Sequence, residues 1–326
     1  MKVARVVVGI VVSAVFAWAT VSRVDLAAVA QALGKAAPLG VALAFGFAWL
    51  EIAVRAWRWR FLLSPLGKVS YRHALAYTCV GYFANTLLPM RLGDVARAYL
   101  AASALRLPRL ATLGSIVVER LTDGITILVV AAGLGFVVTN ASAVAPVELW
   151  LFLAVECAVA LTAVGVIVAR RRAVVEALLP ERLRSLVVRM VRGTAAVQSP
   201  KGIAVAVGST LLAYACAVAA MVAVAGSVGL SITPAQAAFA MAWIGLSTAI
   251  PAAPGSVGTY EFVGVSVLTL LGQDPASSLA AVVLLHVIGT LPVALVGLAT
   301  TWVLHLRVWR LGDATSAAPE SAAQTA

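Results

Sequence analysis

Long apolar runs alternate with short polar segments along almost the whole chain. A helix of roughly 20 apolar residues crosses the hydrocarbon core of a bilayer, so this pattern predicts an all-α fold, a polytopic membrane helical bundle. About six runs are interpreted as full spans. They are residues 3–21, 39–54, 110–138, 149–169, 202–228 and 277–304.

Two further apolar segments are interrupted by proline and glycine. They are residues 73–105, broken at Pro89, and residues 235–271, broken at residues 251–258. The apolar run before Pro89 reaches only about 24 Å as a helix, which is short of a full crossing. We therefore predict two re-entrant or broken helix hairpins. For the first of them, a single long kinked span is the alternative.

The distribution of bases predicts how these elements are oriented, because Lys and Arg gather in cytoplasmic loops. The sides are consistent if the first hairpin enters from the cytoplasm and the second from outside. This places both termini in the cytoplasm, and the opposed entry suggests an inverted repeat. The basic segments are residues 1–5, 55–72, 106–109, 170–201 and 307–310, and the base-free loops are residues 139–148, 227–234 and 272–275.

The composition supports a membrane location and excludes several other classes. The 326 residues are 62% hydrophobic and 11% charged, whereas a soluble domain is nearer half apolar and a quarter charged. The net charge of +11 fits basic cytoplasmic loops facing anionic lipid headgroups rather than nucleic acid. We find no nucleotide-binding fingerprint, nucleophile elbow or metal-ligand spacing, so we expect no cofactor, no metal and no enzymatic activity. The three cysteines lie in apolar runs and are expected to be small core residues.

Several segments have expected roles outside the spans. Residues 1–311 form one transmembrane domain, and residues 312–326 form a disordered tail. Residues 22–35 are expected to be a short polar connection after an uncleaved first span. Residues 55–63 alternate arginine with tryptophan, which suits the headgroup level. Residues 170–201 carry eight Lys or Arg against two Glu, which predicts an amphipathic helix on the cytoplasmic membrane surface.

The first break carries the densest polar motif. Charged residues at membrane depth mark a functional site by default. Arg91, Asp94 and Arg97 are three residues apart and share a helix face. The turn after Pro89 offers unpaired N–H groups, so with the guanidiniums it predicts a site for a lipid phosphate. Alternatively, the arginines neutralise carboxylates so that the bundle packs.

A second polar motif interrupts the next span. Glu119, Arg120 and Asp123 lie near its middle. Glu119 and Asp123 belong to a polar stripe with Ser115, Thr122 and Thr126, which is expected to face the bundle interior. Together with Arg91, Asp94 and Arg97 they sum to zero charge, which fits paired burial and also leaves arginines able to exchange a carboxylate for a phosphate. A proton relay through Glu119 or Asp123 is a weaker alternative.

The second break supplies the third motif. Pro254, Gly255 and Gly258 interrupt the helix, which we expect to resume near Ser256 with Ser256 or Thr259 as its cap. Glu261 then falls in the first turn, where capping alone is the alternative to a binding role. We interpret His286 as a hydrogen-bonded core residue.

Taken together, these motifs resemble those of the lysylphosphatidylglycerol synthase transmembrane region family, whose proteins are flippase-like. The resemblance covers roughly residues 5–305. Some members carry a fused aminoacyl transferase domain, which we do not find here. The resemblance therefore implies lipid translocation rather than aminoacylation. It implies a substrate site that includes Asn85, Pro89, Arg91, Gly93, Asp94, Arg97, Glu119, Arg120, Asp123, Pro254, Gly255, Gly258 and Glu261.

The sequence therefore predicts a multi-pass protein of the bacterial inner membrane that moves an anionic, modified or polyprenyl-linked lipid between leaflets. Its expected partners are membrane lipids with anionic headgroups. Two alternatives remain. One is a membrane-embedded transferase that acts on a lipid phosphate, and the other is an accessory protein whose buried charges only specify packing.

Overall fold

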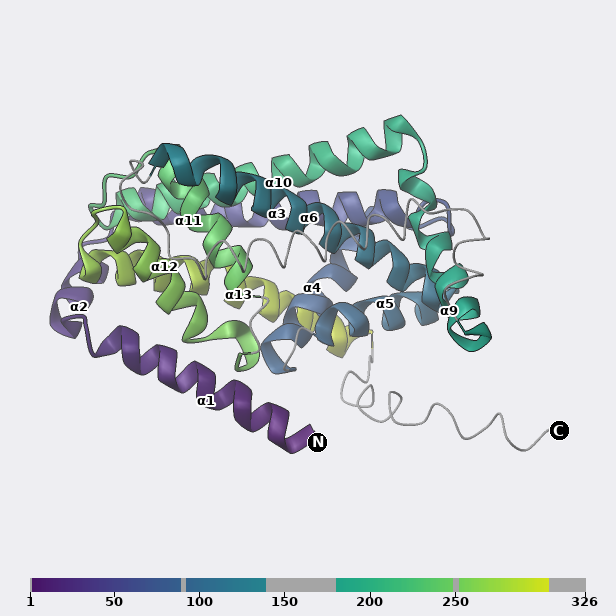
Figure 1. Cartoon of the computed structure of the whole chain (residues 1–326), viewed down its shortest axis with the longest axis horizontal. Helices are drawn as coiled ribbons and strands as arrows, with labels where there is room; N and C mark the ends of the chain where they lie inside the picture. Colours follow the sequence, from purple (N-terminus) through teal and green to yellow (C-terminus); the bar gives the residue numbers. More distant parts are fainter. Residues whose placement is uncertain (1, 89–91, 139–179, 249–251, 305–326) are drawn as a thin grey trace.

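The computed structural model describes residues 2–88, 92–138, 180–248 and 252–304 (Figure 1). In these ranges the regular structure is helical throughout, as predicted. The elements are α1 Lys2–Val21, α2 Leu26–Gly34, α3 Pro38–Leu63, α4 Tyr71–Leu87, α5 Leu92–Ala104, α6 Arg109–Val138, α9 Glu181–Val191, η2 Arg192–Val197, α10 Pro200–Ser227, α11 Pro234–Ser247, η3 Pro254–Ser256, α12 Thr259–Leu270 and α13 Pro275–Val303.

Three of these helices, α3, α10 and α13, are long and apolar enough to cross a membrane. A fourth span results if α1 and α2 are counted as one segment bent by 83°. α6 has 30 residues but carries charged side chains near its middle. The predicted span 149–169 lies outside the described residues.

The connection predicted for residues 22–35 contains a helix, so that prediction is wrong. The carboxylate of Asp25 accepts the Ala27 N–H at 2.8 Å and caps α2. An N-cap carboxylate supplies one of the partners that a helix start lacks. The apolar positions of α2 then pack on the core, where Val29 is buried.

Residues 55–63 are the last turns of α3, and their depth in a membrane stays a prediction. Two of their side chains do not face headgroups, because Arg58 and Trp59 are fully buried, whereas Trp57 is 45% exposed. An Arg–Trp alternation suits an interface, but here α3 packs along α10 and α6. These neighbours supply the polar partners that allow the arginine to be buried.

The first break forms a hairpin and not a kinked span. The Gly93 N–H on α5 donates to the Asn85 side chain on α4 at 2.8 Å. One turn deeper, a Cβ on Gly81 would lie 3.0 Å from Cβ of Arg97, and Arg97 also reaches Thr78. Contacts that move back along α4 as they move forward along α5 define antiparallel helices.

The second break is also followed by a helix that packs back on its predecessor. α11 and α12 contact each other. The loops that flank the pair meet, because the Gln273 side chain donates to the Ser231 carbonyl at 3.3 Å. The start of α11 and the end of α12 therefore lie at the same end of the bundle.

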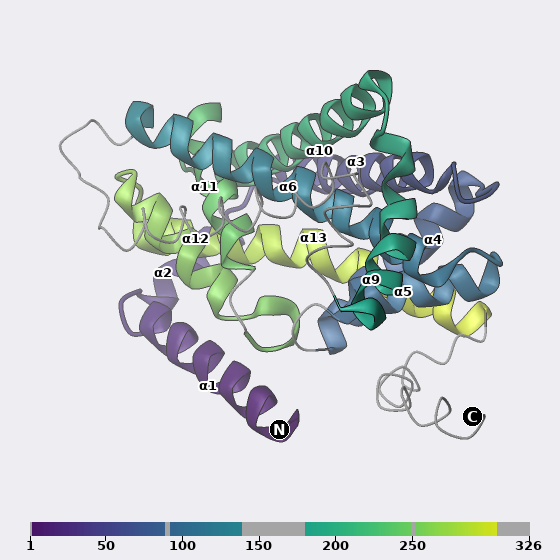
Figure 2. The ribbon, with the colours of Figure 1, turned by 45° about the vertical axis from the view of Figure 1, so that its right-hand side comes forward.

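The two ends of the bundle differ in charge. At one end the loop after α3 meets the loop before α6, where Gly67 lies against Leu107, and α9 packs on the start of α6 with Met190 against Gly114. This brings together three of the predicted basic segments. At the other end lie α2 and the base-free loops at residues 227–234 and 272–275, and Figures 1 and 2 show α2 and α9 far apart. Which end faces the cytoplasm stays a prediction.

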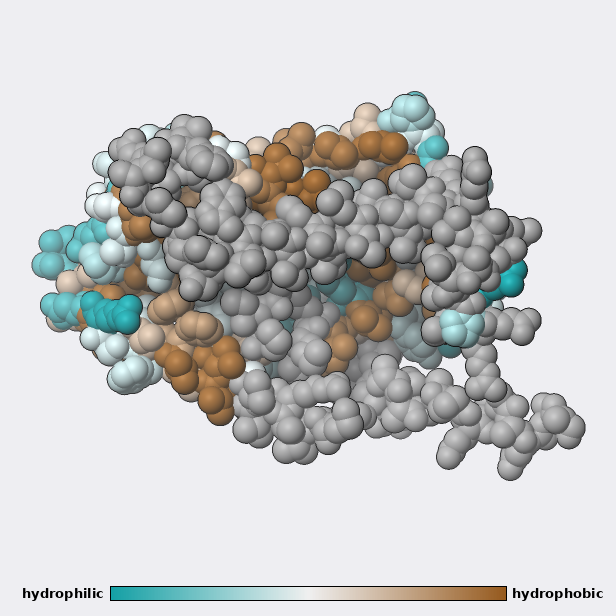
Figure 3. Space-filling model, in the orientation of Figure 1, coloured by the Kyte–Doolittle hydropathy of each residue, from teal (hydrophilic) through white to brown (hydrophobic). Residues whose placement is uncertain are grey.

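The outer surface is apolar where a bilayer would cover it. α10 exposes Ile203, Val207, Leu211 and Leu212, each more than 40% accessible, and brown residues gather along its edge in Figure 3. α1 lies along one side of the bundle and contacts α12. Large exposed apolar faces on several helices are expected of a protein whose solvent is lipid.

Candidate functional site

A compact cluster of charged side chains occupies the space between α3, α5 and α6. Among the described residues, four guanidiniums and four carboxylates are joined by ion pairs of 4 Å or less, so their formal charges cancel. The members are Arg55, Arg58, Arg97 and Arg120 with Glu51, Asp94, Glu119 and Asp123.

Arg58 lies at the centre of the cluster and is fully buried. Its guanidinium pairs with Glu119 at 3.2 Å and with Asp123 at 2.5 Å. It also donates to the Thr210 hydroxyl on α10. A buried charge is tolerated when it is paired and hydrogen-bonded, so Arg58 ties α3 to both α6 and α10.

Arg97 is the second buried arginine, with 1% of its surface exposed. It pairs with Glu119 at 3.1 Å, and its guanidinium carbon lies 4.5 Å from the ring centroid of Trp59. The indole N–H of Trp59 donates to Ser115 at 3.2 Å. The stacked aromatic face and the carboxylate together explain how this cation is held inside the bundle.

Arg120 and Arg55 form the more accessible rim of the cluster. The side chain of Arg120 is 34% exposed and pairs with Asp94, Glu119 and Asp123 at 3.1 to 3.8 Å. The side chain of Arg55 is 16% exposed and pairs with Glu51 at 2.7 Å and Asp123 at 2.9 Å. Of the four guanidiniums, these two are the ones that a ligand could reach from outside, beside the partly exposed carboxylates of Glu51 and Asp94.

The residues predicted around the first break have divided roles. Asn85 holds the hairpin through Gly93. Gly93 permits the close approach expected of it, because a Cβ there would lie 2.2 Å from the Gly81 carbonyl oxygen. Asp94 and Arg97 enter the charge cluster. Pro89 and Arg91 lie outside the described residues, so their predicted roles stay predictions.

The polar stripe predicted on α6 does face the bundle interior. Ser115 and Glu119 are at most 1% exposed and Asp123 is 9% exposed. Five of the six charged residues in the predicted balance lie in the cluster, and the sixth, Arg91, is outside the described residues. Glu51, Arg55 and Arg58 are further members of the cluster.

The second break forms a separate polar site. The Glu261 carboxylate accepts the Gly258 N–H at 2.7 Å and lies 2.6 Å from Nδ1 of His286. Nε2 of His286 lies 3.1 Å from the Gly255 carbonyl oxygen. The Tyr260 ring stacks on the imidazole with a centroid distance of 4.1 Å. We call Gly255, Gly258, Tyr260, Glu261 and His286 the histidine site.

The start of α12 differs from the prediction. A 3-10 turn, η3, begins at Pro254, and α12 begins at Thr259 with Gly258 as N-cap. Neither Ser256 nor Thr259 caps it. Glu261 caps it through the Gly258 N–H, so capping is confirmed for Glu261, and pairing with His286 is an additional role.

α1 covers the second break, which no sequence pattern indicated. The Ala253 N–H donates to the Ser13 hydroxyl at 2.8 Å. A Cβ on Gly258 would lie 2.4 Å from the Ser13 carbonyl oxygen. Gly258 also has φ +89°, so this position requires glycine for both its conformation and its close contact.

The two polar sites are neighbours. η3 contacts α4 of the first hairpin. α13, which carries His286, also contacts α3, which carries Glu51, Arg55 and Arg58. The histidine site thus lies on elements that pack against the elements around the charge cluster.

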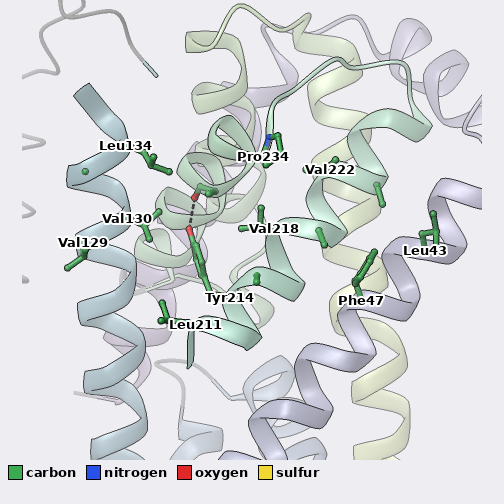
Figure 4. A pocket seen from close by; sticks show the side chains of 15 residues that line it. Leu43, Phe47, Val129, Val130, Leu134, Leu211, Tyr214, Val218, Val222 and Pro234 are labelled. Carbon is green, nitrogen blue, oxygen red and sulfur yellow. Dashed lines mark hydrogen bonds between the residues drawn. The ribbon is translucent and has the colours of Figure 1, made fainter. Parts of the chain in front are cut away.

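An apolar groove adjoins the charge cluster. It has a volume of about 880 Å³ and is formed by α3, α6, α10 and α11. Figure 4 shows Val129, Val130 and Leu134 of α6 on one side, Leu43 and Phe47 of α3 on the other, and Tyr214 between them. Tyr214 donates its hydroxyl proton to the Ala238 carbonyl, so even this polar atom is satisfied inside the protein.

The groove is lined by three of the helices that surround the cluster, α3, α6 and α10. On α3, Phe47 precedes Glu51 by one turn, and on α10, Leu211 directly follows Thr210, the partner of Arg58. A molecule with an anionic head and an apolar tail would find matching surfaces side by side.

Sequence reasoning missed Glu51, Arg55 and Arg58 as site residues. Their spacing of four and three residues places them on one helix face, and that spacing was the available signal. His286 and Ser13 gave no local signal. Among the described residues, no set of His, Cys, Asp and Glu side chains is arranged to hold a metal ion.

Fold and site together define a helical integral membrane protein that keeps compensated charges within its bundle. The chain belongs to the family described as Lysylphosphatidylglycerol synthase TM region, whose pattern matches residues 6–297. This confirms the resemblance drawn from the three motifs. No curated protein matches the chain.

Proposed function

We propose that this protein moves a lipid with an anionic headgroup between the two leaflets of the bacterial cytoplasmic membrane. Modified phospholipids and polyprenyl-linked lipids share the required chemistry, which is a phosphate on an apolar tail. The basic end of the bundle would face the cytoplasm, with both termini on that side.

The observation that carries the proposal is the charge cluster with its accessible rim. Arg120 is about one-third exposed while its three carboxylate partners are largely buried. A lipid phosphate can replace one carboxylate beside Arg120 or Arg55, because both anions accept hydrogen bonds from a guanidinium. The cluster then exchanges one anion for another instead of creating an unpaired charge.

The apolar groove supports the same proposal. The side chains that line it are apolar or, for Tyr214, already hydrogen-bonded, so the groove suits an acyl chain and not a headgroup. A lipid whose phosphate contacts the rim of the cluster could place one chain along α3, α6 and α10 without leaving apolar surroundings. A headgroup that crosses the bilayer without polar partners is costly. Lipid movement therefore needs polar contacts for the headgroup beside an apolar path for the chain.

Binding explains the cluster better than acid–base catalysis does. A membrane transferase needs a carboxylate or base that is free to exchange a proton. Glu51, Asp94, Glu119 and Asp123 are each paired with at least one arginine, so proton exchange at any of them would first have to break an ion pair. We therefore propose a transporter and not an enzyme, with lipids rather than nucleic acid as partners.

Reconstituted vesicles that contain fluorescently labelled phosphatidylglycerol test the proposal. The measured quantity is the rate at which the inner-leaflet label becomes reducible from outside. We expect Arg120→Gln to slow lipid movement by about tenfold to one-hundredfold, since a hydrogen bond between charged groups contributes about 1.5 to 3 kcal/mol.

Arg109→Gln is the matched control, because Arg109 is exposed at the start of α6 and stacks on Tyr99 away from the cluster. It should leave the rate unchanged. Normal lipid movement by folded Arg120→Gln protein would overturn the proposal. If pure protein instead converts the labelled lipid into a new product, as seen by mass spectrometry, the transferase alternative would replace it. Absence of movement in wild-type vesicles would favour the accessory role.

A further inference from the structure

The histidine site is arranged so that it must hold one extra proton. Both ring nitrogens of His286 face acceptors, Nδ1 the Glu261 carboxylate and Nε2 the Gly255 carbonyl. The carbonyl oxygen accepts but cannot donate, so Nε2 must carry hydrogen. The short Nδ1 contact then requires a second hydrogen, placed either on Nδ1 or on the carboxyl group.

Both placements contain the same number of protons. An imidazolium beside a carboxylate and a neutral imidazole beside a carboxylic acid differ only in where the shared proton lies. Either state makes the pair electrically neutral. Removing the proton leaves one negative charge in an environment where Glu261 and His286 side chains are only 14% and 12% exposed, and it places a nitrogen lone pair against an oxygen.

We propose that Glu261 and His286 form a proton-binding site whose occupancy closes the second break, so that release of one proton opens it. The site takes a proton from one aqueous phase and returns it, and no other bond changes. Coupling of this step to lipid movement rests on the proposed function, whereas the proton site itself does not.

The backbone of the second break is suited to respond. Gly255 and Gly258 have φ +74° and +89°, and Ser256 has φ +58°. A non-glycine residue in this region is strained and persists only when its surroundings hold it. His286 holds the Gly255 carbonyl and Glu261 holds the Gly258 N–H. The repulsion between Nδ1 and the carboxylate that follows loss of the shared proton therefore acts on both sides of the turn.

Of the ionisable groups near His286 among the described residues, Glu261 is the hydrogen-bond partner of the imidazole. η3 and α2 carry no ionisable side chain. Glu51 lies on α3, where it is already paired with Arg55 at 2.7 Å. The surrounding elements contribute Tyr260 and Glu261 from α12, Glu51 from α3, Cys79 and Tyr82 from α4, and Cys216 from α10.

The test is amide hydrogen exchange of residues 252–262 in lipid nanodiscs between about pH 5 and pH 9, the range in which a histidine pair titrates. After correction for intrinsic exchange, opening of this segment in the wild type should increase with pH by up to about tenfold per pH unit, the limit for one proton. A flat profile in the wild type would overturn the proposal.

Glu261→Gln is the informative variant, because a glutamine reproduces the protonated state. Its side-chain oxygen can accept the Gly258 N–H while its amide donates to Nδ1 of neutral His286, which keeps Nε2–H for Gly255. We expect residues 252–262 to stay protected at every pH. A wild-type pH profile in this variant would contradict the proposal.

His286→Gln and His73→Gln form the matched control pair. Glutamine at position 286 cannot reach both acceptors, so the break should be open and insensitive to pH. His73 is exposed and pairs with Ser70 at the start of α4, so its replacement should keep the wild-type profile. Loss of the pH response in both variants would contradict a role specific to His286.

Vesicle measurements separate this inference from the proposed function. Under a pH gradient, wild-type lipid movement should change in rate, while the rate in Glu261→Gln vesicles should not depend on the gradient. A pH-dependent break without lipid movement would refute the proposed function and leave the proton site intact. Lipid movement with a break that ignores pH would refute the proton site alone.

Discussion

The charge cluster and the histidine site lie side by side but are held by different forces. The cluster consists of arginines and carboxylates from α3, α5 and α6, each with several partners. The histidine site consists of one carboxylate, one imidazole and two backbone groups at a break. Arginine stays charged in proteins, whereas histidine changes its charge near neutral pH.

This difference separates binding from switching. A network of permanently charged arginines can exchange one anion for another, but its charge does not change with pH near neutrality. A Glu–His pair that holds a strained turn can change its charge by gaining or losing a proton. The two breaks thus contribute different capacities to one membrane path, although both are proline- and glycine-rich in sequence.

The largest effect is expected at the centre of the charge cluster. Arg58→Leu leaves Glu119 and Asp123 with fewer partners inside the bundle. We expect a loss of about 3 to 5 kcal/mol, the usual cost of breaking a buried ion pair, seen as a lower midpoint of unfolding in detergent.

Arg60→Leu is the matched control on the same helix. Arg60 is exposed and donates to the Val69 carbonyl at 3.1 Å, so its loss should cost no more than about 1 to 1.5 kcal/mol. Equal losses in the two variants would mean that the cluster contributes no more than a surface contact, and the comparison between the two sites would fail.

Sequence patterns reached the helical membrane class, the two hairpins and the burial of Arg97, Glu119 and Asp123. They succeeded there because apolar periodicity and helix-breaking residues act locally. The burial of Arg58 was not predicted, because its motif, arginine between tryptophans, is equally compatible with an interface and a core. The choice depends on Thr210, 152 residues away in the sequence.

The cover over the second break shows the same limit more clearly. Ser13 and Ala253 are 240 residues apart, and nothing in the local pattern of α1 distinguishes Ser13 from a serine facing lipid. The helix at residues 26–34 was missed for another reason. It is short and follows a sharp bend, so neither span length nor charge marked it.

An intermediate effect is expected where the first hairpin closes. A methyl group at Gly93 would overlap the Gly81 carbonyl and the Asn85 side chain. Gly93→Ala should therefore separate α4 from α5 and cost about 1 to 3 kcal/mol by overpacking. The measurement is thermal unfolding together with lipid movement, because Asp94 and Arg97 would shift with α5.

Gly124→Ala provides the matched control, since nothing lies within 4 Å of a Cβ at that position of α6. Alanine there should be neutral or should stabilise the helix by up to about 1 kcal/mol. If Gly93→Ala behaves in the same way, the close packing of the hairpin would not position the cluster.

The smallest effect is expected at the cover of the second break. Ser13→Ala removes the hydroxyl that accepts the Ala253 N–H and leaves a partly buried amide without that partner. A lost hydrogen bond of this kind costs about 1 kcal/mol, which corresponds to an increase of about fivefold in local opening. Hydrogen exchange of residues 252–262 measures it, and exchange around Glu119 on α6 should not change.

Ser22→Ala is the control, because the exposed Ser22 hydroxyl contacts only its own helix. This pair of variants decides whether the second break is held by backbone contacts that are independent of the charge cluster. If Ser13→Ala also loosens α6, the two sites are held as one unit. In that case a proton released at His286 would loosen the arginines as well, and binding and switching could not be assigned to separate sites.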